Sequence, residues 1–216
     1  MKVYPVFLIG LADRRCVVIG GGHEAQRKIE GLLECEAAVM VISAAITPQL
    51  SAWNAQGRIK WIKRDYRPGD LQGAFMVIAT GTEPNMSERI WQEAEAEGAL
   101  INVVDDVPHC NFIAGAVARQ GPLTIAISTS GCAPALAVRL RERLERELGP
   151  EYAVLLELLA RLREPLAERY PDFEERRERW YALIDSDVLS LLRQNRPDLA
   201  RQRIAQIVEE GVPHSM

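Results

Sequence analysis

The stretch from Cys16 to Lys28, CVVIGGGHEAQRK, constrains the fold more than any other part of the chain. It begins with a short apolar run rich in β-branched residues, which is typical of a buried strand. Gly20, Gly21 and Gly22 interrupt this run, and polar, helix-forming residues follow. A strand, a tight turn and a helix in this order predict a parallel α/β unit.

The glycine turn also matches the G-x-G-x-x-G/A pattern of dinucleotide-binding sites. Gly20 allows the tight turn, Gly22 lets the backbone approach a pyrophosphate, and Ala25 is small enough for the helix to pack on the strand. The N-terminus of that helix offers N–H groups and a positive dipole end to phosphates. The pattern therefore predicts a nucleotide cofactor, and a plain βα turn is the alternative.

Strand and helix signals continue to alternate as far as Val104. Thr47 and Pro48 are favoured at the N-cap and first position of a helix, and we expect Gly57 and Gly98 to end helices. The expected strands cover residues 16–19, 39–42, 59–62, 74–79 and 100–104, and the other expected helices cover residues 23–34 and 83–97. Near-continuous apolar strands separated by helices predict a parallel sheet covered on both faces.

The pattern changes after Asp105. Two apolar runs, residues 112–118 and 123–127, predict a hairpin appended to the sheet. A loop rich in hydroxyl groups, residues 128–132, then precedes a helix expected over residues 134–148, which Gly149 and Pro150 end. From Glu151 onward the pattern is helical, with about four helices separated at Pro165, Pro171 and Pro197, and a frayed tail over residues 211–216.

Ligands bind at the carboxyl edge of an open parallel sheet, so the residues that follow each strand are candidates for a site. Thr80, Gly81 and Thr82 follow the fourth strand, where they would line the nicotinamide half of a cofactor or form a simple turn.

The second strand ends at Ser43, Ala44 and Ala45. An acid that holds the ribose hydroxyls and an arginine for a 2′-phosphate are both missing there, so this position does not separate NAD from NADP.

The fifth strand ends in Asn102 and Val103, and Asp105 and Asp106 follow shortly after. A carboxylate beside an apolar cleft can have a raised pKa and act as a general base or acid, and His109 could share that work. The alternatives are a turn or cap role for Asp106 and a loop histidine without a catalytic role.

The second half of the chain also carries polar candidates. Ser128 and Thr129 lie just ahead of a helix N-terminus, where hydroxyls bind carboxylates or phosphate, or cap the helix. Arg139 is one of several arginines on that helix, which form either a cationic wall for a polyanionic substrate or a solvated face.

Composition excludes several function classes. A net charge of −4 gives no reason to expect binding to nucleic acid or to an acidic membrane. The four cysteines are scattered without a C-x-x-C pair, which argues for reduced thiols in a cytoplasmic protein and against a disulfide framework or a zinc site. We expect no signal peptide and no membrane span.

Taken in order, the motifs resemble a known family. The segments 4–7, 15–22 and 25–28 resemble the opening of precorrin-2 dehydrogenase, the dehydrogenase/ferrochelatase module of siroheme synthase. Residues 102–105 and 111–113 resemble the central signature of that family, and residues 122–129 and 134–137 resemble its third block. Ser130 and Ala133 depart from the pattern, where the family commonly has glycine and serine, and Thr129 stands where some relatives carry a modifiable serine.

The resemblance implies oxidation of precorrin-2 to sirohydrochlorin with NAD, a homodimer, and catalysis linked to Asp105. The cofactor would be held by the glycine turn, His23, Glu24, the end of the second strand, Thr80 to Thr82, Asn102 and Val103. The polyanionic tetrapyrrole would be bound by Ser128, Thr129, Arg119 and Arg139. No dedicated metal site is expected.

The expected fold is therefore α/β: a Rossmann-like sheet over residues 1–111, a dimerisation hairpin and helix over residues 112–149, and an all-helical domain over residues 150–210. Two other functions stay open. One is a bifunctional enzyme that also inserts Fe²⁺ into sirohydrochlorin, and the other is a nucleotide-sensing regulatory module without catalysis.

Overall fold

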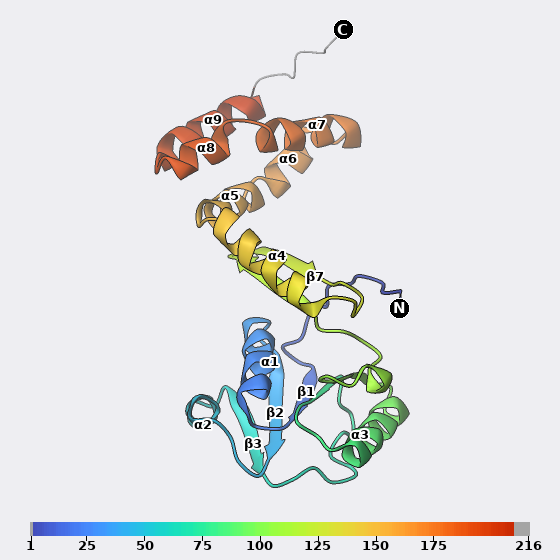
Figure 1. The fold of residues 1–216 in the computed structure, drawn as a ribbon. Helices are drawn as coiled ribbons and strands as arrows, with labels where there is room; N and C mark the ends of the chain where they lie inside the picture. Colours follow the sequence, from blue (N-terminus) through green and yellow to red (C-terminus); the bar gives the residue numbers. More distant parts are fainter. Residues whose placement is uncertain (1, 210–216) are drawn as a thin grey trace. The chain divides into compact units, whose positions relative to one another are not determined.

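The computed structural model describes residues 2–209, and the chain divides into two compact units (Figure 1). One unit comprises residues 4–114. The other comprises the described residues from Gly115 onward, together with Lys2 and Val3. The predicted tail over residues 211–216 lies outside the described residues.

The first unit is built on a five-stranded parallel sheet with the strand order β3-β2-β1-β4-β5. The strands are β1 (Arg15–Ile19), β2 (Ala38–Ser43), β3 (Ile59–Lys63), β4 (Met76–Ala79) and β5 (Leu100–Val103). The helices are α1 (His23–Glu34), α2 (Pro48–Ala55) and α3 (Pro84–Ala96), with a 3₁₀ turn, η1 (Val107–His109). The prediction of a parallel α/β sheet is confirmed.

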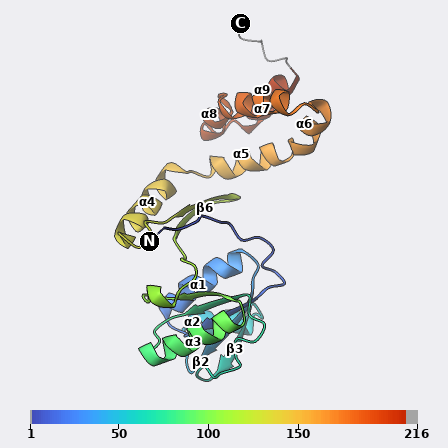
Figure 2. The ribbon, with the colours of Figure 1, turned by 90° about the vertical axis from the view of Figure 1, so that its right-hand side faces the viewer.

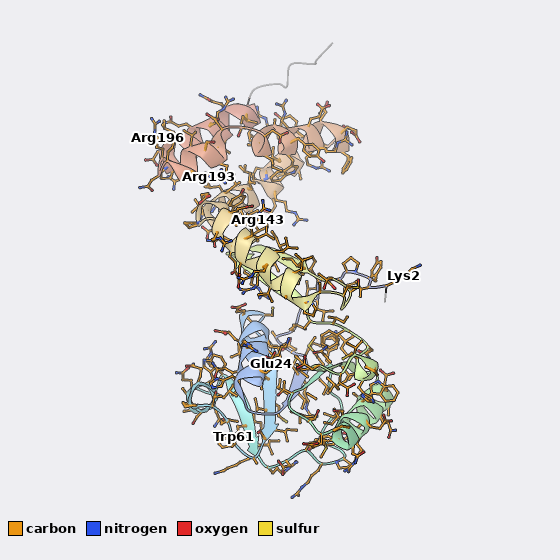
Figure 3. The ribbon with its side chains drawn as sticks, in the orientation of Figure 1. Lys2, Glu24, Trp61, Arg143, Arg193 and Arg196 are labelled. Carbon is orange, nitrogen blue, oxygen red and sulfur yellow. The ribbon has the colours of Figure 1, made fainter. Side chains whose placement is uncertain are left out.

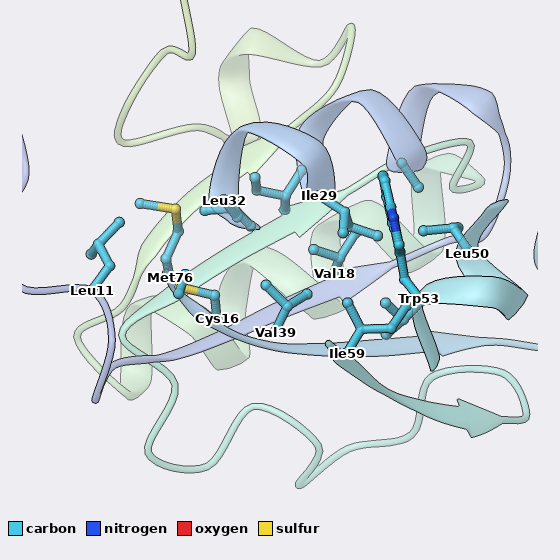
Figure 4. Close-up of a cluster of buried hydrophobic side chains, with 14 residues drawn as sticks. Leu11, Cys16, Val18, Ile29, Leu32, Val39, Leu50, Trp53, Ile59 and Met76 are labelled. Atoms are coloured by element: carbon cyan, nitrogen blue, oxygen red, sulfur yellow. The ribbon is translucent and has the colours of Figure 1, made fainter. Parts of the chain in front are cut away.

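Both faces of this sheet are covered, as the near-continuous apolar strands predicted. On one face, Val18 packs with Ile29 of α1 and with Leu50 and Trp53 of α2 (Figure 4). On the other face, the neighbouring residues of β1 pack with α3 in a second apolar cluster. Successive side chains of a strand point to opposite faces, so β1 supplies both cores and is buried throughout its last four residues.

Local signals set the helix starts. Thr47 is the N-cap of α2, where its hydroxyl accepts a hydrogen bond from the backbone N–H of Leu50 at 3.2 Å. Pro48 follows at the first helical position, where its missing N–H costs nothing. The N-cap of α1 is Gly22, which has no side chain to cap the helix.

The second unit begins with an antiparallel hairpin, β6 (Ala116–Gln120) and β7 (Leu123–Ile127), on which α4 (Pro134–Glu147) packs (Figure 2). Five further helices follow: α5 (Glu151–Ala160), α6 (Arg163–Arg169), α7 (Phe173–Ile184), α8 (Val188–Arg193) and α9 (Pro197–Glu209). Their buried side chains form a third core, which includes Leu155, Leu166, Leu183 and Ile204.

Two details of this unit correct the predictions. The hairpin forms a two-stranded sheet of its own and does not extend the parallel sheet. Its first strand also begins at Ala116 rather than at residue 112, because the N–H groups of Asn111 and Phe112 bond to the carbonyl oxygen of Ile101 on β5.

The helical part has one helix more than expected between residues 151 and 209. The extra boundary lies between α7 and α8, where the Ser186 hydroxyl donates to the carbonyl oxygen of Leu183 and accepts from the N–H of Val188. Pro165 does not separate two helices. It lies in the first turn of α6, where a helix tolerates proline.

Candidate functional site

The strands of the first unit end level with one another, which brings their following loops to one edge. Ile19 of β1 is in register with Ile42 of β2 and Ala79 of β4, and Ala79 is in register with Val103 of β5. Between β1 and β4 the chain order reverses direction across the sheet, which is the place where open α/β folds bind ligands.

Hydrogen bonds fix the glycine turn to both neighbouring strands. The N–H of Gly20 donates to the carbonyl oxygen of Ile42 at 3.0 Å, and the N–H of Thr47 donates to the carbonyl oxygen of Gly21 at 3.0 Å. On the other side, the N–H of Thr80 donates to the carbonyl oxygen of Ile19 at 2.9 Å. The turn is therefore held rigidly at the switch point.

The first two glycines are required by packing. Gly20 has a φ of +107°, and a Cβ there would collide with the hydroxyl and the carbonyl oxygen of Thr80. A Cβ on Gly21 would collide with the carbonyl oxygen of Ala45. These contacts explain why the chain has no side chain at either position.

Gly22 is different, because a Cβ there would meet nothing within 4 Å and its φ of −80° is open to any residue. It is exposed, and it begins a helix whose first N–H groups receive no bond from a side chain at the N-cap. The positive end of the α1 dipole thus faces open space, which fits an anionic ligand such as a pyrophosphate.

His23 and Glu24 form the first turn of α1. His23 is exposed. Glu24, which is labelled in Figure 3, pairs with Arg27 and lies 3.8 Å from the ammonium of Lys28. These ion pairs direct the Glu24 carboxylate along the helix.

β2 ends at Ser43, and neither this residue nor the two that follow is an acid. The Ser43 hydroxyl donates to the carbonyl oxygen of Ala45 at 2.7 Å, and Ala44 and Ala45 are exposed. Lys63 of β3 is in register with Ser43 and lies over the Trp61 ring at 5.6 Å. Sequence reasoning missed this cation, which only the pairing of β2 with β3 brings to the edge.

In the loop after β4, two threonine hydroxyls make hydrogen bonds within the protein, and the glycine between them is exposed. The Thr80 hydroxyl is buried and donates to the carbonyl oxygen of Ile19 at 3.3 Å, and the Thr82 hydroxyl bonds to that of Ser87 at 2.8 Å. Gly81 lies exposed between them with a φ of +61°.

Asp105 lies in the tight turn that follows β5. Its backbone is left-handed, with a φ of +64°, and its side chain is exposed. The turn is closed by a hydrogen bond from the N–H of Asp106 to the carbonyl oxygen of Val103 at 3.1 Å. A left-handed conformation is costly for a residue other than glycine, although aspartate tolerates it better than most.

Lys28 lies within electrostatic range of Asp105, a neighbour that the sequence did not reveal. Burial lowers the pKa of the Lys28 ammonium, the Arg27 charge lowers it further, and the Asp105 carboxylate opposes both. Helical spacing places Lys28 one turn beyond Glu24 on α1, and its proximity to Asp105 has no signal in the sequence.

His109 contacts acids other than Asp105. Its Nδ1 lies 2.7 Å from an Asp106 carboxylate oxygen, and its Nε2 lies 2.8 Å from a Glu88 carboxylate oxygen. Hydrogen bonds first to Asp106 and then to Glu88 raise the pKa of the His109 imidazole. Sequence reasoning missed Glu88, which lies 21 residues away on α3.

The polar groups of Asn102, Cys110 and Asn111 are used within the protein. The buried Asn102 amide donates to the carbonyl oxygen of Phe112 at 3.1 Å, and the N–H of Val103 donates to the Cys110 sulfur at 3.2 Å. The Asn111 amide oxygen accepts from the N–H of Ile101 at 2.8 Å. These bonds fasten residues 110–112 along the outer edge of β5.

The remaining candidates belong to the second unit, where Arg119 lies on β6 and the other three make local bonds. The Ser128 hydroxyl accepts from the N–H of Ser130 at 3.1 Å, and the Thr129 hydroxyl accepts from the N–H of Ala133 at 3.2 Å, just ahead of α4. Arg139 is exposed and pairs with Glu142 at 2.8 Å. Similar pairs follow along α4, so this helix carries charges of both signs.

Within residues 2–209, no helix is long and apolar enough to cross a membrane. The same residues contain no group of three or more histidine, cysteine, aspartate and glutamate side chains that could hold a metal ion.

The fold, the open glycine turn and the uncapped helix at the switch point define a dinucleotide-binding protein. Three family models match the chain in order: "Putative NAD(P)-binding" over residues 7–116, "Sirohaem biosynthesis protein central" over residues 120–147, and "Sirohaem synthase dimerisation region" over residues 151–208. The chain belongs to this family of NAD(P)-binding sirohaem-biosynthesis proteins.

Known relatives agree with this placement. The chain is 34% identical over 211 residues to a siroheme synthase of Neisseria meningitidis serogroup C. The aligned region covers 98% of this chain and 44% of the relative. It is 33% identical over 212 residues to the siroheme synthase of Thioalkalivibrio sulfidiphilus, covering 98% and 43%. The chain thus spans less than half the length of these relatives.

The solved structure of SirC, described as a precorrin-2 dehydrogenase, has the same fold. It superposes with a TM-score of 0.76 at 24% sequence identity, covering 94% of this chain and all of that one.

Proposed function

We propose that this chain oxidises precorrin-2 to sirohydrochlorin, with NAD as the hydride acceptor. The observation that carries the proposal is that an NAD(P)-binding region, which holds the glycine turn, is followed along one chain by two sirohaem-biosynthesis regions. The cofactor is held by Gly20, Gly21 and Gly22 and by the first N–H groups of α1. The other predicted cofactor contacts are His23, Glu24, Ser43, Ala44, Ala45, Thr80, Gly81, Thr82, Asn102 and Val103.

Asp105 is the proposed base. Oxidation of precorrin-2 removes a hydride and a proton, and a bound nicotinamide would supply the hydride acceptor. The Asp105 carboxylate, exposed at the same sheet edge as the glycine turn, takes the proton. The Lys28 ammonium lies within electrostatic range of this carboxylate.

The second unit is proposed to serve substrate binding and assembly. Ser128, Thr129, Arg119 and Arg139 contact the carboxylates of the tetrapyrrole. The chain forms a homodimer, to which residues 112–149 and the helical domain over residues 150–210 contribute. The match to a dimerisation region over residues 151–208 supports this assembly. We also propose a cytoplasmic location, in keeping with cysteines that form no disulfide.

Anaerobic incubation with enzymatically made precorrin-2 and either NAD or NADP tests the proposal. We expect an increase in NADH absorbance, with NAD preferred. Asp105→Asn keeps a residue type that tolerates the left-handed turn and removes the charge. We expect it to lose turnover at least 100-fold and to keep NAD binding. Asp13→Asn, in an exposed loop, is the matched control.

Other outcomes separate the alternatives. Full activity of Asp105→Asn would show that the base is another group. Cofactor binding without any turnover of precorrin-2 would favour a nucleotide-sensing module. Insertion of Fe²⁺ into sirohydrochlorin without NAD would identify a bifunctional enzyme.

A further inference from the structure

His109 links two elements that meet beside the proposed base. Its imidazole lies between the Asp106 carboxylate, in the turn after β5, and the Glu88 carboxylate of α3. The amide of Gln92, one turn further along α3, donates to the other Glu88 oxygen at 2.5 Å. The His109 ring also meets the Trp91 ring edge-on, with centroids 5.7 Å apart. Partners on two sides thus fix both the position and the plane of the imidazole.

The two carboxylates determine what the ring can do. Only an imidazolium donates from both nitrogens, whereas a neutral ring would direct one lone pair at a carboxylate oxygen. Both carboxylates therefore favour the protonated form, consistent with the raised pKa of His109. A general base needs an unprotonated nitrogen that faces the substrate, and both nitrogens here face protein acids. The geometry therefore disfavours proton transfer by His109.

The turn that His109 anchors is strained at Asp105. Its φ of +64° is sparsely populated for a residue other than glycine, and such a conformation persists only where surrounding contacts over-determine it. Cys110 supplies one set of contacts, since its sulfur accepts from the N–H of Val103 and donates to the carbonyl oxygen of Asp106 at 3.3 Å. His109 supplies the other set, because it ties the Asp106 side chain to α3.

We infer that His109 is a positioning residue, which holds the Asp105 turn against α3 through the Asp106 and Glu88 carboxylates. This inference rests on the proposed role of Asp105 as the base. It assigns Glu88 to the same function, although Glu88 lies in a helix that carries none of the motifs singled out in the sequence.

The contacts of His109 with the Asp106 and Glu88 carboxylates are called the clamp below. Two variants break the clamp from opposite sides. His109→Phe keeps an aromatic ring against Trp91 and removes both hydrogen bonds, and Glu88→Ala removes the α3 anchor and keeps the histidine. We expect each to lower kcat on precorrin-2 about tenfold or more, since small misplacements of a catalytic group have large effects, with KM for NAD within twofold. The double variant should be no slower than the slower single variant, because both remove one clamp.

A role in proton transfer predicts a different result. His109→Phe would then be far slower than Glu88→Ala and would lose one limb of the pH–rate profile, whereas Glu88→Ala would stay near wild type. That result would overturn the inference, as would wild-type rates in both variants.

Amide hydrogen exchange tests the clamp without any turnover. Exchange in residues 104–111 should be at least tenfold faster in both variants and unchanged in Glu30→Ala, which removes an exposed carboxylate from α1. Unchanged exchange in the clamp variants would refute the clamp. If the wild type does not oxidise precorrin-2, the proposed function fails, and exchange still decides whether His109 holds this turn.

Discussion

Gly22→Ala separates the cofactor role of the glycine turn from its structural role. Gly22 has a φ of −80° and open space where a Cβ would lie, so alanine fits the folded chain without strain. Replacement of glycine by alanine at a compatible position restricts the unfolded chain and stabilises a protein by about 0.4–1 kcal/mol. Gly22 is also the N-cap of α1, where glycine is favoured over alanine, so the two effects oppose one another. We therefore expect Gly22→Ala to unfold at a urea concentration close to that of the wild type.

Cofactor binding should weaken, although the fold is retained. If a pyrophosphate approaches the Gly22 backbone, the new methyl group occupies part of its site and forces it away from the N–H groups of α1. Overpacking by one methyl group costs about 1–3 kcal/mol, which corresponds to roughly 5- to 150-fold weaker binding. Isothermal titration calorimetry with NAD and with NADP measures this loss directly.

Two matched glycine variants complete the experiment. Gly31→Ala adds a methyl group in the interior of α1, with nothing within 4 Å of it, and should stabilise the helix by up to ~1 kcal/mol without changing NAD affinity. Gly21→Ala should destabilise the fold, because its Cβ collides with the Ala45 carbonyl oxygen. Wild-type NAD affinity in Gly22→Ala would refute the reasoning, since the phosphates would then lie elsewhere.

Two further predictions concern an ion pair of the first unit and the thiols of the chain. The Arg64 guanidinium donates to both carboxylate oxygens of Asp70 at 2.7 Å and holds the pKa of that carboxyl below its usual value. The pair therefore stabilises the fold above the unfolded-state pKa of Asp70. This stabilisation is lost as the pH falls through the folded-state pKa. Asp70→Asn should lower the urea midpoint at pH 7, and its difference from wild type should shrink below about pH 4; a constant difference would contradict this account. Burial raises the pKa of the Cys16 thiol to about 11, so Ellman's reagent should label Cys16 only after unfolding. The exposed Cys35 and Cys132 should react at once. Labelling of Cys16 in the native protein would show that β1 opens.

Much of the first unit could be predicted because its signals are local. A helix over residues 23–34 follows from the glycine turn and the polar residues beside it, and Thr47 with Pro48 sets the start of α2. The start of β6 could not be predicted, since it depends on bonds from residues 110–112 to a strand ten residues earlier. The boundary between α7 and α8 depends on one serine hydroxyl, which leaves no mark in the apolar pattern.

The candidate site shows the same division. Strand ends could be located from the sequence, so Thr80 and Asp105 are found at the carboxyl edge as expected. Side-chain partners from distant elements could not be located. The pairing of His109 with Glu88 and the proximity of Lys28 to Asp105 both require the folded arrangement of α1, α3 and β5.

The outer edge of β5 determines where the sheet stops. A doubly wound sheet continues with a sixth strand beside its fifth. Here the backbone groups of Ile101 and Val103 that such a strand would need already bond to Cys110, Asn111 and Asp106. Side chains and turn N–H groups thus occupy backbone groups of β5 that would otherwise be a template for pairing with another molecule, and such free templates on exposed edges lead to aggregation. The sheet of the first unit therefore ends at β5, and no second half continues it within residues 4–114. Any surface that such a second half would offer to a substrate has to come from outside these residues.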